Sequence, residues 1–238
     1  MGATFVLIAA SFGAAAPSFA GEAPDTTVEA LVDLNPGTTE AQLLAEASEL
    51  ASALGTTPEA ILEQQLAEAE ESAAAAAGGF AAKSSSSGGG GTVTLGSATR
   101  KGDIFISPSS TLFIEHGHTG IYYTTATIVE APGTGSKSRS ASASSIKVGK
   151  GAVKQYVSTT QANRNKAANY AYNSMRGKPY NANFANNRYV PASSYNCSQL
   201  VWGAYKQTTS IDLDSNGGLG VYPYNIKDSN KTVTYKTL

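Results

Sequence analysis

The first apolar pattern along the chain has helical spacing. Residues 39–54 carry apolar side chains three or four positions apart, and Gly55 ends the pattern. Thr57 then provides an N-cap with Pro58 at the first helical position, and a second apolar stripe continues to position 69. These stretches predict a helical hairpin. Because it contains no aromatic residue, it cannot bury much of a core alone.

Farther along, the pattern changes to short runs that are typical of strands. Residues 103–107, 118–123 and 127–131 are rich in Ile, Val, Tyr and Thr. Two helices are predicted after them, over residues 161–176 and from Cys197 onward. Strands and helices mix without the regular alternation of a parallel sheet, so the expected fold class is α+β.

A run rich in Ser and Gly separates the two patterns. Residues 83–91 offer the backbone freedom and nothing to pack, which is typical of a linker. We therefore expect an acidic helical segment over residues 21–82 and one folded domain over residues 92–238. The domain is long enough for one substantial core.

Charge divides the chain at the same place. Residues 1–82 hold twelve acidic residues and no Lys or Arg, whereas the remainder holds six acidic and seventeen basic residues. The net charge of −1 thus conceals parts of about −12 and +11. A basic domain suits work against an anionic cell envelope, although such charge often serves solubility alone.

The first twenty residues have the composition of a secretory signal peptide. They carry no charge, are apolar over residues 5–10 and end in the small-residue pattern Ser18-Phe19-Ala20, although the usual Lys or Arg before the apolar run is absent. The run is shorter than the roughly 18 apolar residues that span a membrane. We expect cleavage after Ala20 and a secreted or cell-envelope protein whose mature chain has no transmembrane span.

The chain has a single cysteine, Cys197. An oxidising compartment normally recruits cysteines in pairs, so a lone one is either a buried small hydrophobe or a reactive thiol, and composition leaves both readings open. Cys197 stands where a helix is predicted to begin, after a loop over residues 191–196. The free N–H groups and positive dipole end of a helix stabilise a thiolate at that position.

Thiol catalysis also needs a general base, and the domain offers His116 and His118. His118 is the better candidate because it begins a strand, whereas His116 precedes a flexible Gly and is expected to be solvated. If the hairpin turn centres on Thr124, His118 lies directly opposite Glu130. That turn has no Gly or Asn, so the register is open by a residue. A solvated charge at a strand end is the alternative for Glu130.

Two apparent metal motifs are set aside. Residues 212–217 begin like a calcium loop, but position twelve is Pro223 instead of the required Glu. One Cys and two His separated by a single residue do not have the ligand spacing of a zinc site. No metal and no other cofactor is expected.

Several motifs follow one another in order across residues 102–226, nearly the whole basic domain. Together they resemble the permuted papain-like cysteine hydrolases of the YiiX type, which are related to the NlpC-type cell-wall peptidases. The motifs are Gly102-Asp103-Ile104, Gly117-His118-Thr119-Gly120-Ile121-Tyr122, Val129-Glu130-Ala131, Gly177-Lys178-Pro179-Tyr180, Tyr195-Asn196-Cys197-Ser198-Gln199-Leu200-Val201-Trp202 and Asp212-Leu213-Asp214-Ser215-Asn216-Gly217-Gly218.

The resemblance implies a permuted papain-like fold, with an antiparallel sheet, packed helices and the His strand ahead of the Cys helix. It also implies that Cys197 is the nucleophile, His118 the base and Glu130 the orienter. Tyr180 would lie beside the thiol and, with the Cys197 backbone N–H, polarise the scissile carbonyl. The family's commoner Asp-Cys-Ser is Asn196-Cys197-Ser198 here, which keeps the nucleophile and replaces the acid by an amide.

Three functions are consistent with this sequence. The first is a secreted amidase or peptidase that acts through a thioester, with a peptide or peptidoglycan fragment as substrate and no nucleic-acid partner. The second is an acyl-ester or lipid hydrolase or acyltransferase on the same fold. The third is a non-catalytic envelope-binding module in which Cys197 is packed core. The acidic helices are either a pro-segment that damps activity until the linker is cut, or a spacer.

Overall fold

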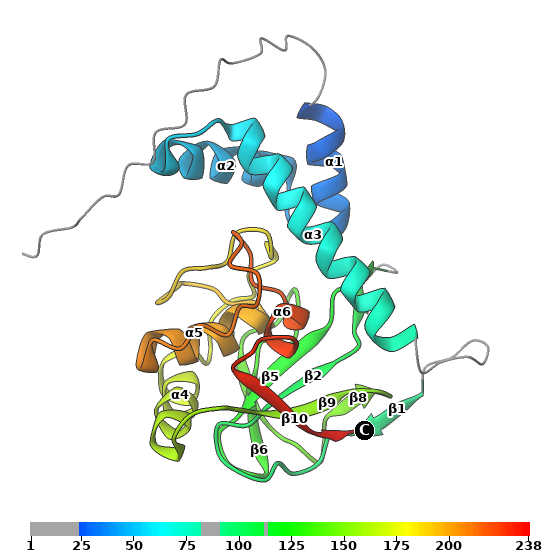
Figure 1. Cartoon of the computed structure of the whole chain (residues 1–238), viewed down its shortest axis with the longest axis vertical. Coiled ribbons are helices and arrows are strands. Elements are labelled where there is room, and N and C mark those ends of the chain that lie inside the picture. The colour runs from blue at the N-terminus through cyan, green and yellow to red at the C-terminus, as the bar shows by residue number, and fades with distance from the viewer. Residues whose placement is uncertain (1–23, 82–90, 112–113) are drawn as a thin grey trace, which may run out of the picture.

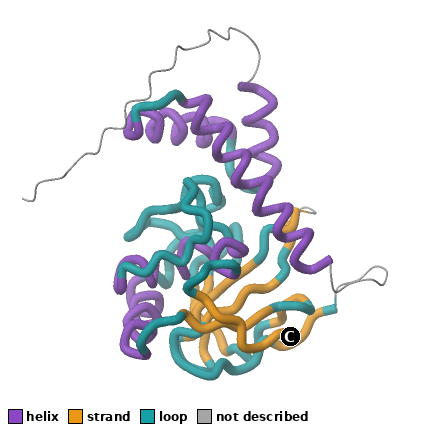
Figure 2. The backbone as a smooth tube through the Cα atoms, in the orientation of Figure 1, coloured by secondary structure: helices purple, strands orange, loops and turns teal. Residues whose placement is uncertain are grey.

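The computed structural model describes residues 24–81, 91–111 and 114–238, so the expected signal peptide and most of the expected linker lie outside the described residues. Helices α1 and α2 lie at one end of the molecule, and α3 runs from that end down beside the part formed by the strands and helices α4–α6 (Figures 1 and 2). In chain order the elements are α1 (Pro24–Leu34), α2 (Glu40–Leu54), α3 (Pro58–Ala81), β1 (Thr92–Thr94), β2 (Ile104–Ser107), β3 (Ser110–Thr111), β4 (Ile114–Glu115), β5 (His118–Tyr122), β6 (Thr127–Glu130), β7 (Arg139–Ser142), β8 (Lys147–Gly149), β9 (Val153–Val157), α4 (Gln161–Ser174), α5 (Cys197–Thr209), α6 (Pro223–Lys227) and β10 (Thr232–Thr237).

A six-stranded sheet of order β10-β9-β2-β5-β6-β7 is the scaffold of the second part, and every pairing in it is antiparallel. The antiparallel sheet and the packed helices agree with the predicted α+β class. The predicted strands lie within a residue of their observed bounds, and α4 ends two residues before the predicted end.

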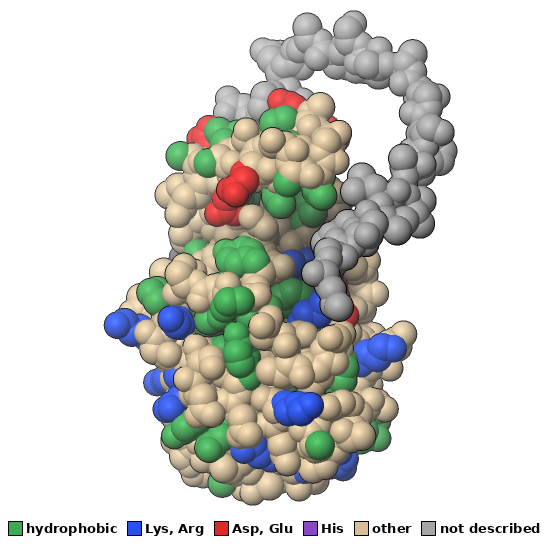
Figure 3. All heavy atoms as spheres, turned by 90° about the vertical axis from the view of Figure 1, so that its left-hand side faces the viewer, with side chains coloured by type: hydrophobic (Ala, Val, Ile, Leu, Met, Phe, Trp, Pro, Cys, Tyr) green, Lys and Arg blue, Asp and Glu red, His purple; other side chains and the backbone are tan. Residues whose placement is uncertain are grey.

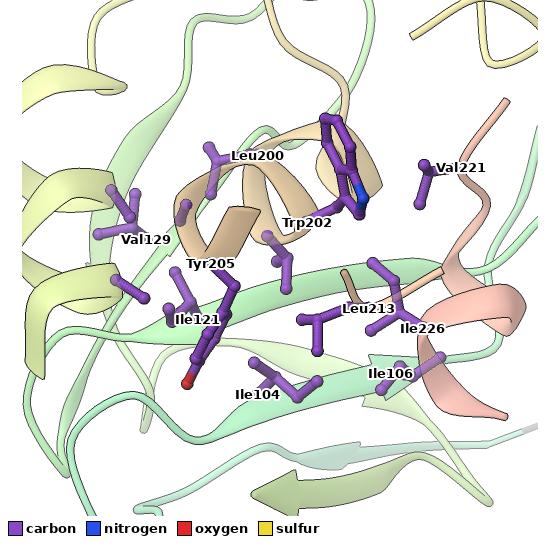
Figure 4. Close-up of a cluster of buried hydrophobic side chains, with 14 of the residues drawn as sticks. Ile104, Ile106, Ile121, Val129, Leu200, Trp202, Tyr205, Leu213, Val221 and Ile226 are labelled. Carbon is purple, nitrogen blue, oxygen red and sulfur yellow. The ribbon is translucent and has the colours of Figure 1, made fainter. Parts of the chain in front are cut away.

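Both faces of the sheet are covered, because strands β2, β5 and β6 alternate apolar side chains between two cores. On one face, Ile104 and Ile121 pack against Leu200 and Tyr205 of α5 (Figure 4). On the other face, Phe105 packs in a separate cluster with residues of β5, β6 and β8. Since β2 and β5 are central in the sheet, the first residue of β5 is held in a fixed position and direction.

The acidic segment contains three helices, whereas the sequence predicted a hairpin of two. Its second helix begins at a capping box formed by Thr39 and Gln42 and ends at Gly55 in the left-handed conformation, as its sequence predicted. The missed helix is α1, whose Val28 and Leu31 are buried. No described helix is both long enough and apolar enough to cross a bilayer.

The three helices share an apolar cluster with the second part of the molecule. Leu31, Leu43 and Leu62 are buried in it together with Phe184 and Cys197. The cluster of the segment thus includes aromatic side chains of the second part, Phe184 and Tyr222. This contact explains how a segment unable to bury a core alone is packed.

Adjacent leucines of α2 provide a test of this packing. Leu43 is fully buried and Leu44 is 39% exposed. We expect Leu43→Ala to lower the free energy of unfolding by about 2–5 kcal/mol, because it removes buried methyl groups and leaves a cavity. Leu44→Ala should cost less than about 1 kcal/mol. Urea unfolding followed by circular dichroism measures both, and equal losses would contradict the packing.

Candidate active site

Cys197 is the first residue of α5 and is 1% exposed. The helix begins there because Asn196 is an N-cap: its Oδ1 accepts a hydrogen bond from Gln199 N at 2.8 Å. The amide also donates through Nδ2 to the carbonyl of Asn183 at 3.3 Å, a bond that a carboxylate could not make. Asn196 thus caps the helix and ties it to the preceding loop.

His118 is the first residue of β5 and pairs with Ser107 of β2. Its ring makes a hydrogen bond with the side chain of Cys197 at the start of α5. The ring of Phe105 meets it edge-on, with centroids 5.7 Å apart. Its side chain is 19% exposed. The structure therefore brings together the Cys and His that lie far apart in the sequence.

Glu130 lies beside His118, although the predicted hairpin register is wrong. Ile121 pairs with Val129, which centres the turn on residue 125 and continues to a pairing of Glu130 with Gly120 instead of His118. Because positions two apart share a face of a strand, the Glu130 side chain still reaches the ring. Its Oε2 lies 2.9 Å from His118 Nε2 and accepts the N–H of that nitrogen. Nδ1 is then the ring nitrogen that remains for the thiol.

Arg139 is a site residue that sequence reasoning missed. It pairs directly with Glu130 across β6 and β7, and its Nε and Nη2 donate to Glu130 Oε1 at 3.0 and 2.9 Å. The side chain of Glu130 is only 3% exposed, so this second partner compensates a buried charge. Strand β7 is rich in Ser and lacks an apolar alternation, and its sequence therefore gave no signal for a strand.

The charges at the site stabilise a protonated imidazole. Burial lowers the pKa of His118, but hydrogen bonds and charge interactions with Cys197 and Glu130 outweigh it and raise the pKa to about 10. Burial likewise raises the pKa of Glu130, but His118 and Arg139 outweigh it and hold that pKa below its ordinary value. The result is an anion between two cations, with the sulfur on the far side of the ring. This is the arrangement that favours a thiolate nucleophile.

Tyr180 is brought to the thiol as the resemblance implied. Pro179 before it is held twice, by a bridge to Lys137 and by a hydrogen bond from Tyr195 N at 3.0 Å. Burial and then the charge of Cys197 raise the pKa of the Tyr180 phenol well above its ordinary value. The hydroxyl therefore stays protonated and can donate to an oxygen that gains negative charge.

His116, which was expected to be solvated, is half-buried instead. Its ring stacks on Phe184, with centroids 5.7 Å apart, and Phe184 stacks in turn on Tyr222. The apolar surroundings of the site thus include a histidine that packs as an aromatic ring.

The carboxylates of the apparent calcium loop bind cationic side chains. Asp212 and Asp214 both form ion pairs with Arg188, and Asp212 also accepts from Lys206 and from the indole of Trp202. Within the described ranges, no group of three or more His, Cys, Asp or Glu side chains is placed to hold a metal ion. The loop is explained as a structural ion-pair network.

Comparison with known proteins assigns the chain to a family. Residues 91–237 match the model of the permuted papain-like amidase enzymes, YaeF/YiiX, peptidase family C92. The chain belongs to this family. It is therefore a member of a family of papain-like cysteine amidases and peptidases, which act on peptide substrates.

Two proteins illustrate the similarity. The uncharacterized protein YycO of Bacillus subtilis strain 168 is 35% identical over 214 residues, which are 88% of this chain and 86% of YycO. Since residues 91–238 are under two thirds of the chain, that similarity extends into α1–α3. The crystal structure of the metalloprotein YiiX from Escherichia coli O157:H7 is 15% identical with a TM-score of 0.39, and the match covers 58% of this chain and 97% of that one.

The charge arrangement predicts how His118 titrates. Its stabilising contribution is fully present below the ordinary histidine pKa of about 6.5 and is lost as pH rises through about 10. Glu130→Gln removes a charge that raises this pKa, so the NMR titration of His118 should move down by about 1–3 units. An unchanged His118 titration would contradict the assigned pairing.

Arg139 should affect how the free energy of unfolding changes in acid, through its effect on the pKa of Glu130. The pKa of Glu130 is lowered in the folded protein, so its contribution is present above the unfolded pKa and is lost as pH falls through the folded one. Arg139→Met removes one cause of the lowering, so the acid-induced loss of stability that is due to Glu130 should be smaller and should be complete at a higher pH. Arg139→Lys keeps the charge and should change the profile less. Urea unfolding between pH 3 and 7, roughly the range in which a carboxylate titrates, measures this.

Proposed function

We propose that the protein is a secreted cysteine amidase that cleaves an amide bond in peptidoglycan stem peptides through a thioester on Cys197. The observation that carries the reaction is the constellation at the start of α5, in which His118 contacts Cys197 and is held by Glu130. Peptide hydrolysis follows from the family. The choice of wall peptides is supported by the signal-like first twenty residues and by the basic side chains spread over the second part of the molecule (Figure 3).

The two ring nitrogens of His118 have different roles in the reaction. The proton of the Cys197–His118 pair lies on His118 Nδ1 while Nε2 remains bonded to Glu130, and the thiolate of Cys197 attacks the amide carbonyl. The oxygen that becomes negative receives hydrogen bonds from the Tyr180 hydroxyl and from the Cys197 N–H. That N–H is free to donate because the first N–H groups of a helix have no intrahelical acceptor.

Collapse of the tetrahedral intermediate breaks the C–N bond. The proton on His118 passes to the leaving amine, and an acyl group remains on the sulfur. Water then attacks the thioester while His118 acts as the base. This step releases the acid and frees the side chain of Cys197 for another reaction cycle. Glu130 and Arg139 keep the ring oriented through both half-reactions.

The two histidines give a matched test on soluble muropeptides prepared from purified peptidoglycan. Cys197→Ala should yield no cleavage products by mass spectrometry, and His118→Ala should lower kcat/KM by about 10²–10⁴-fold, the usual contribution of a general base. His116→Ala should remain within about tenfold of the parent because that ring packs on Phe184. Full activity in Cys197→Ala would refute the mechanism.

The same variants decide between substrate classes. Cys197-dependent release of acid from acyl esters, with no cleavage of muropeptides, would replace the wall substrate by a lipid one. If the unmodified protein binds muropeptides but hydrolyses neither muropeptides nor acyl esters, the domain is a binding module. Neither result is expected from a family of amidases.

A further inference from the structure

The loop that follows α5 is tied directly to the first turn of the Cys197 helix. Ser198 Oγ donates to the carbonyl of Val221 at 2.6 Å. Asn187, in the loop that precedes α5, donates to the same carbonyl at 2.8 Å and accepts from Val221 N at 2.7 Å. Its Nδ2 also reaches Asn196 Oδ1 at 3.3 Å. A displacement of residues 216–222 would therefore move the helix that carries the thiol.

A carboxylate from α3 holds this loop. Glu68 is 7% exposed, and its Oε1 and Oε2 accept the N–H groups of Leu219 and Gly220, each at 2.9 Å. A Cβ at Gly218 would lie 2.3 Å from a Glu68 side-chain atom, so the approach requires a glycine there. The two residues that donate to this carboxylate immediately precede Val221, which is bonded to the first turn of the Cys197 helix.

The helical segment also makes polar contacts with the loop that precedes α5. Asn35 is fully buried, and its Oδ1 accepts from Phe184 N at 3.1 Å. Glu46 Oε2 accepts from the amides of Asn183 and Asn186 at 2.7 and 3.0 Å. Both loops that flank α5 are thus fixed from α1–α3. Those helices are also within the region similar to YycO.

We propose that α1–α3 are a permanent part of the catalytic unit, and that Glu68 is a positioning residue that sets the place of Cys197 through residues 219–221. The inference rests on the proposed role of Cys197. It differs from the pro-segment that the sequence suggested, because a segment holding the active-site loops in place should support activity. Removing it would expose Phe184 and Ala185 and would leave three loop N–H groups without their protein acceptors.

Glu68→Ala in the full chain tests the proposal, with Glu70→Ala as control. Glu70 is exposed on the same helix, so the control matches the change in charge and in helix composition. We expect Glu68→Ala to lower kcat on muropeptides at least about tenfold with a smaller change in KM, as the loss of a bond to a charged group allows. Glu68→Gln keeps one acceptor oxygen and should be intermediate.

Amide hydrogen exchange gives a readout that does not need catalysis. Glu68→Ala should accelerate exchange at Leu219 and Gly220 and also at Val221 and Gln199, which the carboxylate does not contact. Acceleration confined to Leu219 and Gly220 would overturn the positioning role even if the parent cleaves no muropeptide. A rise in kcat would overturn it too, since it would make α1–α3 an inhibitor.

A cut in the linker separates the two roles of the segment. A recognition site for a specific protease, placed within the Ser/Gly run of residues 84–91, allows cleavage after folding. We expect the two pieces to co-elute in gel filtration and kcat to stay within about twofold of the uncut protein. Release of the helices with increased activity would show a pro-segment and refute the proposal.

Discussion

The buried carboxylate of Glu130 is the interaction on which the arrangement of the site depends. It is 3% exposed and binds cations on two sides, His118 on β5 and Arg139 on β7. An isolated buried charge is costly, and removing either partner leaves the other two groups poorly compensated. The same pairing therefore fixes the direction of the imidazole, keeps it protonated and joins three neighbouring strands. The ion pairs of Glu130 thus contribute both to the stability of the sheet and to the orientation of the catalytic imidazole.

The sequence predicted that Cys197, His118 and Glu130 lie together, and the structure places the three side chains in contact even though the predicted register was wrong. The hairpin register was wrong, yet Glu130 reaches His118, because a shift of two residues leaves a side chain on the same face of its strand. The sequence therefore indicated the residue types of the site and the strand face on which they lie. It gave no indication of Arg139, because β7 is a Ser-rich strand whose pairing with β6 is established only in the folded sheet.

The contacts of the helical segment could not be read from the sequence for a different reason. Glu68 meets Leu219 and Gly220 across about 150 positions, and no local pattern specifies such a partner. The same holds for His116, which the adjacent Gly suggested was solvated and which Phe184 in fact covers. Helix α1 was within reach of sequence reasoning, because Val28 and Leu31 have helical spacing, and it packs mainly against α2 and α3.

The docking of α1–α3 on the second part does not depend on the opposite net charges of the two parts. Two thirds of the acidic residues and none of the basic ones lie in residues 1–82, and in Figure 3 the basic side chains lie on the second part; attraction between opposite charges would be the simplest way to dock the two parts. Yet none of the ion pairs among the described residues joins α1–α3 to the second part. Glu68 and Glu46 bind backbone N–H groups and amides instead. Such short, partly buried bonds are screened by salt far less than attraction between exposed charges. The docking is therefore specific to two loops, and the exposed charges of both parts remain available to solvent and substrate.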